Sequence, residues 1–65
     1  MTYEEALAWC IEHMAQVTFF DEQYQHRVTV RAAGFPHNTA TRNSFVEAVE
    51  ATKQLVERAE RAQSE

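Results

Sequence analysis

The sequence predicts a single small α+β domain of 65 residues, in the order helix, strand, strand, helix, with an antiparallel hairpin packed against both helices. Three observations predict this class. Apolar residues recur at helical spacing near both ends of the chain, and they alternate with polar residues in the middle. The only glycine and the only proline follow the alternating stretch, where they end a strand. We therefore expect helices at about residues 3–16 and 44–62, a hairpin at about 17–33 and a loop at 34–43.

The first helix begins at a capping box, in which Thr2 is the N-cap and Glu5 reaches back from the third helical position. Apolar residues then follow at helical spacing: Tyr3, Leu7, Cys10, Met14 and Val17. One such stripe is typical of a helix that buries one face. We therefore expect Leu7 at the centre of the buried face.

Strict alternation predicts the hairpin. One side of its second strand carries Tyr24, His26, Val28, Val30 and Ala32, which we expect to face the core. The other side is polar and includes Arg27 and Arg31, and Phe20 of the first strand should join them on the uncovered face. A short acidic turn around residues 21–23 should join the strands, without the Asn-Gly signal that would fix its type.

A second capping box, Ser44-Phe45-Val46-Glu47, begins the second helix. Its apolar stripe again has helical spacing: Phe45, Val49, Thr52, Val56 and Ala59. This pattern predicts a helix that packs one face against the hairpin.

A chain of this length buries only about 60% of the surface that it exposes when unfolded, so its stability is marginal without a supplement. One cysteine excludes an internal disulfide and suits a reducing compartment. A two-stranded sheet also leaves both edges unpaired, which favours pairing with another chain. We therefore expect a homodimer or docking onto a partner protein. No apolar run is long enough to span a membrane, and the acidic N-terminus is unlike a signal peptide, so we expect a soluble, cytoplasmic protein.

Charge is segregated along the chain. Residues 1–22 carry a net charge of −5, residues 23–43 carry +3 and residues 44–65 carry −2, which sum to the net −4 of the chain. Such segregation favours association with a charged partner or with a second copy of the chain.

The short stretch Cys10-Ile11-Glu12-His13 invites a chemical interpretation. Cys10 and His13, three positions apart on one helix, could bind zinc together with His26, and a small metal-binding protein is one alternative. Paired ligand motifs such as CxxC are absent, so core packing of Cys10 is the preferred interpretation. The chain has no glycine-rich phosphate loop and little material for a catalytic cleft. We expect no catalysis and no cofactor.

A nucleic-acid-binding module is the second alternative. Arg27, Arg31 and Arg42 form a basic patch beside Phe20, which offers a stacking surface. The stretch VTVRAAGFPHNTATRNSFVEAVEATKQLV resembles the C-terminal half of a double-stranded-RNA-binding domain and the half-domain of HicB antitoxins. The resemblance implies RNA binding, but the lysine cluster of such domains is replaced by Thr41-Arg42-Asn43, and the net charge of the chain opposes phosphate binding.

Trp9 is the residue that the expected helix explains least. At 100° per residue it lies about 200° from Leu7, on the same side as Glu5, Glu12 and His13. Tryptophan is costly to expose and is enriched at binding hot spots. The sequence therefore predicts a non-enzymatic protein-interaction module, such as an adaptor, an antitoxin-like regulator or a phage-encoded inhibitor. Its partner surface would be this side of the helix or the sheet face with Phe20, Arg27 and Arg31.

Overall fold

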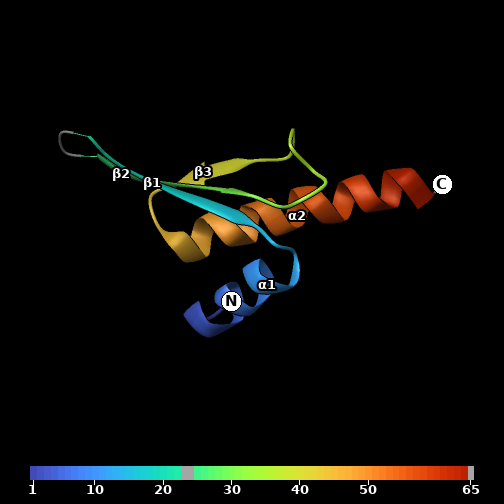
Figure 1. The fold of residues 1–65 in the computed structure, drawn as a ribbon, viewed down its shortest axis with the longest axis horizontal. Coiled ribbons are helices and arrows are strands. Elements are labelled where there is room, and N and C mark those ends of the chain that lie inside the picture. The colour runs from blue at the N-terminus through green and yellow to red at the C-terminus, as the bar shows by residue number, and fades with distance from the viewer. Residues whose placement is uncertain (23–24, 65) are drawn as a thin grey trace.

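The computed structural model describes residues 1–22 and 25–64. Its elements, in order, are α1 (Tyr3–Glu12), β1 (Gln16–Glu22), β2 (Gln25–Arg31), β3 (Ala40–Arg42) and α2 (Phe45–Ser64) (Figure 1). The strands form one antiparallel sheet in the order β1-β2-β3. The predicted α+β class, with a hairpin packed on helices, is confirmed.

The third strand corrects the prediction that residues 34–43 form a loop. Ala40, Thr41 and Arg42 pair with Val30, Thr29 and Val28 of β2, in that order. The hydroxyl oxygens of Thr29 and Thr41 lie 2.9 Å apart and share a hydrogen bond. Three residues are too few to show an alternating pattern, so only the tertiary pairing with β2 identifies this segment as a strand.

The first strand of the hairpin is longer than predicted. Asp21 lies opposite His26 and Glu22 opposite Gln25, so β1 continues through the segment that was expected to turn. The Asp21 carboxylate and the Nδ1 atom of His26 lie 3.1 Å apart as a cross-strand pair. The expected turn residue Gln23 and the expected core residue Tyr24 lie outside the described residues.

The inner face of β2 supplies much of the core. Val28 and Val30 of β2, and Ala32 directly after it, are all buried, as their alternation predicts. His26 is exposed, contrary to the prediction, because it lies near the end of the hairpin beyond the helices. The core therefore lies under the half of the hairpin that is nearer to α1.

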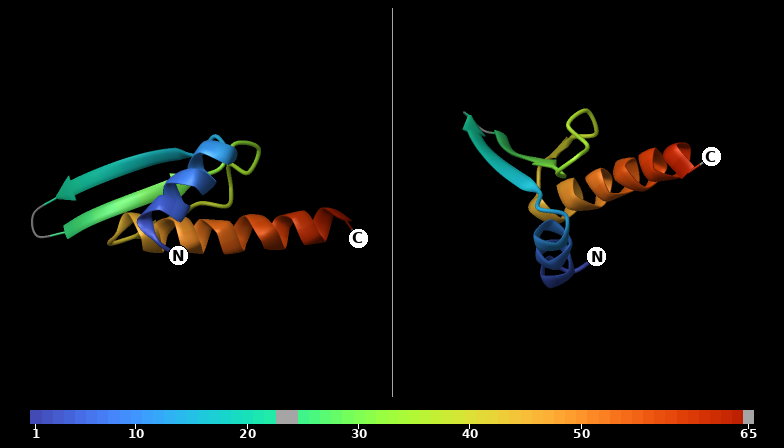
Figure 2. Two further views of the ribbon diagram at one scale, coloured as in Figure 1. Left: turned by 90° about the horizontal axis from the view of Figure 1, so that it is seen from below. Right: turned by 45° about the vertical axis from the view of Figure 1, so that its right-hand side comes forward.

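Helix α2 covers β2 and β3, and α1 packs against α2 (Figure 2). The predicted stripe of α2 is confirmed, since Val49, Thr52 and Val56 are buried and Phe45 is partly buried. The hydroxyl of the buried Thr52 donates a hydrogen bond of 3.1 Å to the Val30 carbonyl. This bond ties the helix to the central strand.

The N-terminal capping box of α1 is present as predicted, but the helix ends at Glu12 and buries a different face. Ala6, Trp9 and Cys10 lie in the core, whereas Leu7, the predicted centre of the buried face, is 39% exposed. Figure 2 shows α1 crossing α2 and leading away from the sheet. The small Ala6 and Ala48 of α2 belong to the same core cluster, and the packing of α1 against α2 decides which side of α1 is buried.

Candidate interaction surface

Trp9 is a core residue. It is 8% exposed, and its indole stacks on the His13 ring with centroids 4.2 Å apart. The Nδ1 atom of His13 lies 2.9 Å from the Trp9 carbonyl oxygen and bonds to it. The prediction that Trp9 lies on the side of the helix away from the core is therefore wrong. The interface predicted around it, with Glu5, Glu12 and His13, loses its central residue.

The two carboxylates of that predicted interface are exposed. Glu5 has a local role, because its carboxylate accepts a hydrogen bond of 3.2 Å from the backbone N–H of Thr2. This bond lowers the pKa of Glu5. Its charge is therefore already used in capping α1.

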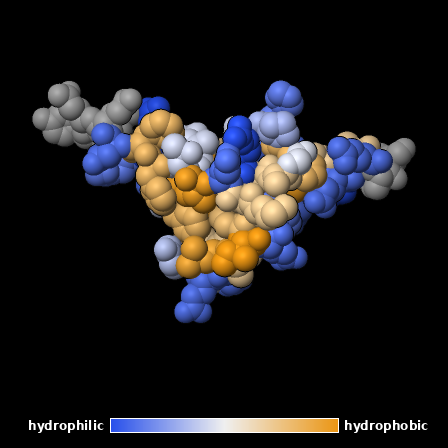
Figure 3. Space-filling view, in the orientation of Figure 1, coloured by the Kyte–Doolittle hydropathy of each residue, from blue (hydrophilic) through white to orange (hydrophobic). Residues whose placement is uncertain are grey.

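A different apolar surface is exposed instead. Five large side chains on α1, on the connection after it and on β1 face solvent: Tyr3, Leu7, Ile11, Met14 and Phe19. With Cys10, Ala15, Val17 and Phe45 they line a groove of about 530 Å³. Figure 3 shows apolar surface extending from the sheet towards α1.

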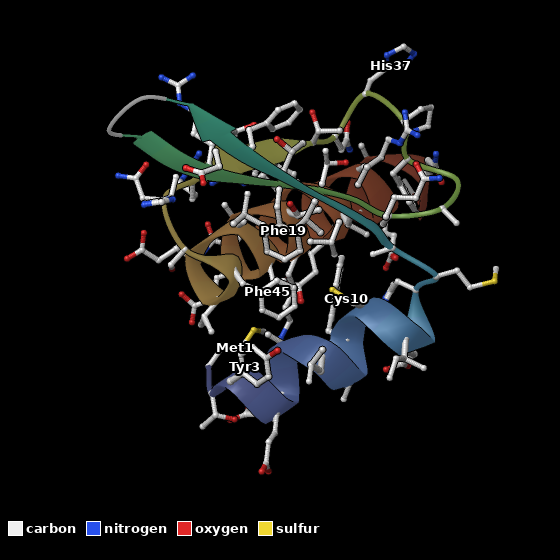
Figure 4. All side chains as sticks on the ribbon, turned by 60° about the vertical axis from the view of Figure 1, so that its left-hand side comes forward. Met1, Tyr3, Cys10, Phe19, His37 and Phe45 are labelled. Atoms are coloured by element: carbon white, nitrogen blue, oxygen red, sulfur yellow. The ribbon has the colours of Figure 1, made fainter. Side chains whose placement is uncertain are left out.

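Phe19 is the main contribution of β1 to this groove. It lies opposite Val28 in the sheet, and paired residues share a face, so it is on the helix side. Val28 is 5% exposed, but Phe19 is 70% exposed, because α2 covers β2 and β3 and leaves β1 open. Figure 4 shows Phe19 pointing from the sheet towards Phe45, with Tyr3 beyond it on α1. The Tyr3 and Phe45 rings are 5.4 Å apart and tilted, so they form one wall of the groove.

Met14 lies at the end of this groove in an unusual backbone conformation. Its φ is +49°, in the left-handed region that favours glycine. It ends α1 in a Schellman motif, with hydrogen bonds from the Ala15 N–H to the Cys10 carbonyl (2.8 Å) and from the Met14 N–H to the Ile11 carbonyl (3.3 Å). Its side chain is also 75% exposed. The stability of the fold therefore gives no reason for methionine at this position.

Cys10 is buried in the floor of the groove, and burial raises the pKa of its thiol. A protonated thiol is a poor nucleophile and a poor metal ligand. Among the described residues, no group of three or more His, Cys, Asp or Glu side chains lies close enough to hold a metal ion. Cys10, His13 and His26, which the zinc hypothesis named, therefore do not form such a group.

The outer sheet face brings together part of the predicted basic patch. Phe20 lies directly opposite Arg27, and Arg31 lies on the same face and donates a hydrogen bond to Gln16. Arg42 pairs with Val28, so it lies on the other face of the sheet and donates to the Thr41 carbonyl at 2.8 Å. The patch of three arginines is therefore split between two faces.

Comparisons with protein-family models, with curated proteins and with solved structures found no significant match. The resemblance to double-stranded-RNA-binding domains and to HicB thus gains no support from them. In the part of the chain that the structure describes, neither helix is long and apolar enough to cross a bilayer.

Proposed function

We propose that this chain is a non-enzymatic protein-interaction module that acts as a homodimer, with the apolar groove between α1 and β1 as its binding surface. One observation carries the proposal: five large apolar side chains are exposed together on one side of a small domain. Burial of apolar surface is the dominant favourable contribution to association, and a patch of this kind is typical of an interaction site.

The size of the patch supports this proposal. Tyr3 is 59% exposed, Ile11 77% and Phe19 70%, with Leu7 and Met14 beside them. An aromatic side chain offers about 150–250 Å² and the three aliphatic ones somewhat less, so the patch exposes on the order of 600 Å². That is at the upper end for a typical monomer and close to the roughly 800 Å² that each partner buries in a standard interface.

Met14 supports the proposal independently. A left-handed conformation costs a non-glycine residue about 1–2 kcal/mol, and glycine would avoid this cost. Met14 is nevertheless held in that conformation, exposed at the end of the groove. Contact between its flexible thioether side chain and a partner would account for a methionine at this position.

Sedimentation velocity at low micromolar and at submillimolar concentration tests the proposal. We expect a concentration-dependent dimer for the unmodified chain. The variant Ile11→Glu, which places a charge in the groove, should weaken self-association at least tenfold. Gln54→Glu adds the same charge on an exposed position of α2 outside the groove and should leave it unchanged. A strict monomer at every concentration, or equal behaviour of the two variants, would overturn the proposal.

A second candidate function is nucleic-acid binding by the outer sheet face. The observation that favours it is the direct pairing of the half-exposed Phe20 with Arg27, with Arg31 on the same face. Aromatic and basic side chains together are typical of single-strand binding surfaces. Fluorescence polarisation with single-stranded and duplex oligonucleotides at two salt concentrations tests it. Binding that falls with salt and is lost in the double variant Arg27→Glu, Arg31→Glu would support it, and no binding at low salt would exclude it.

A further inference from the structure

The outer edge of β1 lies beside the groove and is open for pairing. β1 is an edge strand of seven residues, Gln16–Glu22, that contains neither lysine nor proline. Natural proteins protect edge strands with charged side chains, above all lysine, with proline, with bulges or by making them short. The opposite edge, β3, has three residues and ends in Arg42. The charged residues of β1, Asp21 and Glu22, lie at one end, so Gln16–Phe20 is the longest uncharged stretch of edge among the described strands.

We propose that the occupant of the groove is a second copy of this chain, whose β1 pairs antiparallel with β1 about a two-fold axis at Phe19. This inference rests on the proposed homodimer and specifies its arrangement. Phe19 is the middle residue of Gln16–Glu22, so the axis places the two Phe19 residues opposite each other. Both rings lie on the helix side of the joined sheet, where each enters the groove of the other copy.

The groove has room for the incoming ring. Its volume is about 530 Å³, whereas an apolar cavity of about 150 Å³ is enough to hold benzene. The ring that enters would meet Phe45 and Tyr3, whose own rings are 5.4 Å apart. Opposed aromatic residues on neighbouring strands stabilise strand pairing. Phe19 of the second copy thus fills the groove at whose edge Phe19 of the first copy is exposed.

Self-complementarity favours a second copy over a foreign strand. A two-fold interface uses the same patch on both subunits, and an antiparallel strand that pairs with itself meets this condition. In this register, Thr18 of one copy lies opposite Phe20 of the other, and Val17 lies opposite Asp21. The apolar side chain of Phe19 stays at the centre, and the polar residue Gln16 lies at the margin, as in ordinary interfaces.

Disulfide trapping tests the register, in a Cys10→Ala background so that no other thiol reacts. Directly opposed residues have Cβ atoms about 4.5–5.5 Å apart, near the span of a disulfide, and diagonal neighbours are about 7–8 Å apart. Under mild copper-catalysed air oxidation, we expect Phe19→Cys to form a covalent dimer. Phe20→Cys, the matched neighbour on the other face of β1, should not.

A mixing experiment leaves the two Phe19 rings intact. Chains with Thr18→Cys and chains with Phe20→Cys should form a covalent heterodimer when mixed, and neither should cross-link alone. A dimer in sedimentation that is lost in Ile11→Glu but gives none of these cross-links would overturn the strand pairing and leave the proposed function standing. A chain that is monomeric at every concentration would overturn both.

Discussion

Replacement of Met14 by glycine should stabilise the isolated chain while weakening its self-association. Met14 ends α1 at φ +49°, where glycine carries no penalty from a Cβ atom. Relief of the left-handed conformation is worth about 1–2 kcal/mol, and the greater freedom of glycine in the unfolded chain costs about 0.5–1 kcal/mol. Because the Met14 side chain is 75% exposed, its loss removes little packing. The net gain in the free energy of unfolding should be about 0.5–1 kcal/mol.

Thermal unfolding followed by circular dichroism, at a concentration too low for dimers, measures this gain. For a domain of this size, 1 kcal/mol shifts Tm by about 4–8 °C, so Met14→Gly should raise Tm by roughly 2–8 °C. Met14→Ala is the matched control, because it removes the same side chain but keeps a Cβ atom. A Tm of Met14→Gly no higher than that of Met14→Ala would refute the reasoning about the backbone. In sedimentation at high concentration, both variants should dimerise less than the unmodified chain.

Three further predictions concern the core and the cap. Trp9→Ala should lower the free energy of unfolding by about 3–5 kcal/mol, a large part of the total for so small a domain, and urea titration should show the loss of a cooperative transition. Thr52→Val should cost about 1 kcal/mol in the same titration, because the Val30 carbonyl loses its buried donor. The hydrogen bond from the Thr2 N–H to the Glu5 carboxylate lowers the pKa of Glu5. The ionised carboxylate therefore stabilises the fold at neutral pH, and this stabilisation is lost as the pH falls through the lowered pKa. Between pH 7 and pH 3, thermal unfolding should therefore show a greater loss of stability for the unmodified chain than for Glu5→Gln, which does not titrate.

Each of these has an outcome that contradicts it. Trp9→Ala with near-normal stability would mean that the stacked ring is not part of the core. Thr52→Val should be compared with Thr18→Val on the exposed face of β1, and equal costs would deny the importance of the buried hydroxyl. Identical pH profiles of Glu5→Gln and the unmodified chain would show that the Glu5 carboxylate does not contribute to the pH dependence of stability.

The parts of the fold that follow a strong local pattern could be predicted from the sequence. Val49, Thr52 and Val56 repeat at helical spacing on an otherwise polar helix, and they are buried as expected. Val28 and Val30 alternate with polar residues, and the pleat of a strand then determines which side is inner. A local pattern of this kind needs no knowledge of the partner element.

The errors arose where tertiary contacts decide between equivalent local choices. Helix α1 is apolar on more than one side, so its periodicity allowed either Leu7 or Trp9 to face the core. Packing against α2 selects Trp9, and the left-handed Met14 ends the helix before the predicted stripe is complete. The repeat of Tyr3, Leu7 and Ile11 at four-residue intervals was the available sign of a second apolar face.

The candidate site was missed for the same reason. The groove exists only because α1 turns its second apolar face towards the open strand, and this orientation is not encoded in any short segment. The outer sheet face with Phe20 and Arg27, by contrast, depends on strand alternation alone, and the register confirms it. The short strand around Thr41 has too few residues to produce a pattern.

Sedimentation of the chain beside two neighbouring variants tests the central claim most directly. Phe19→Arg and Phe20→Arg place the same charge on adjacent residues of β1, one in the groove and one on the outer face. We predict that, at submillimolar concentration, the unmodified chain and Phe20→Arg sediment as dimers and Phe19→Arg as a monomer. A monomeric unmodified chain, or a Phe19→Arg variant that still dimerises, would contradict the account.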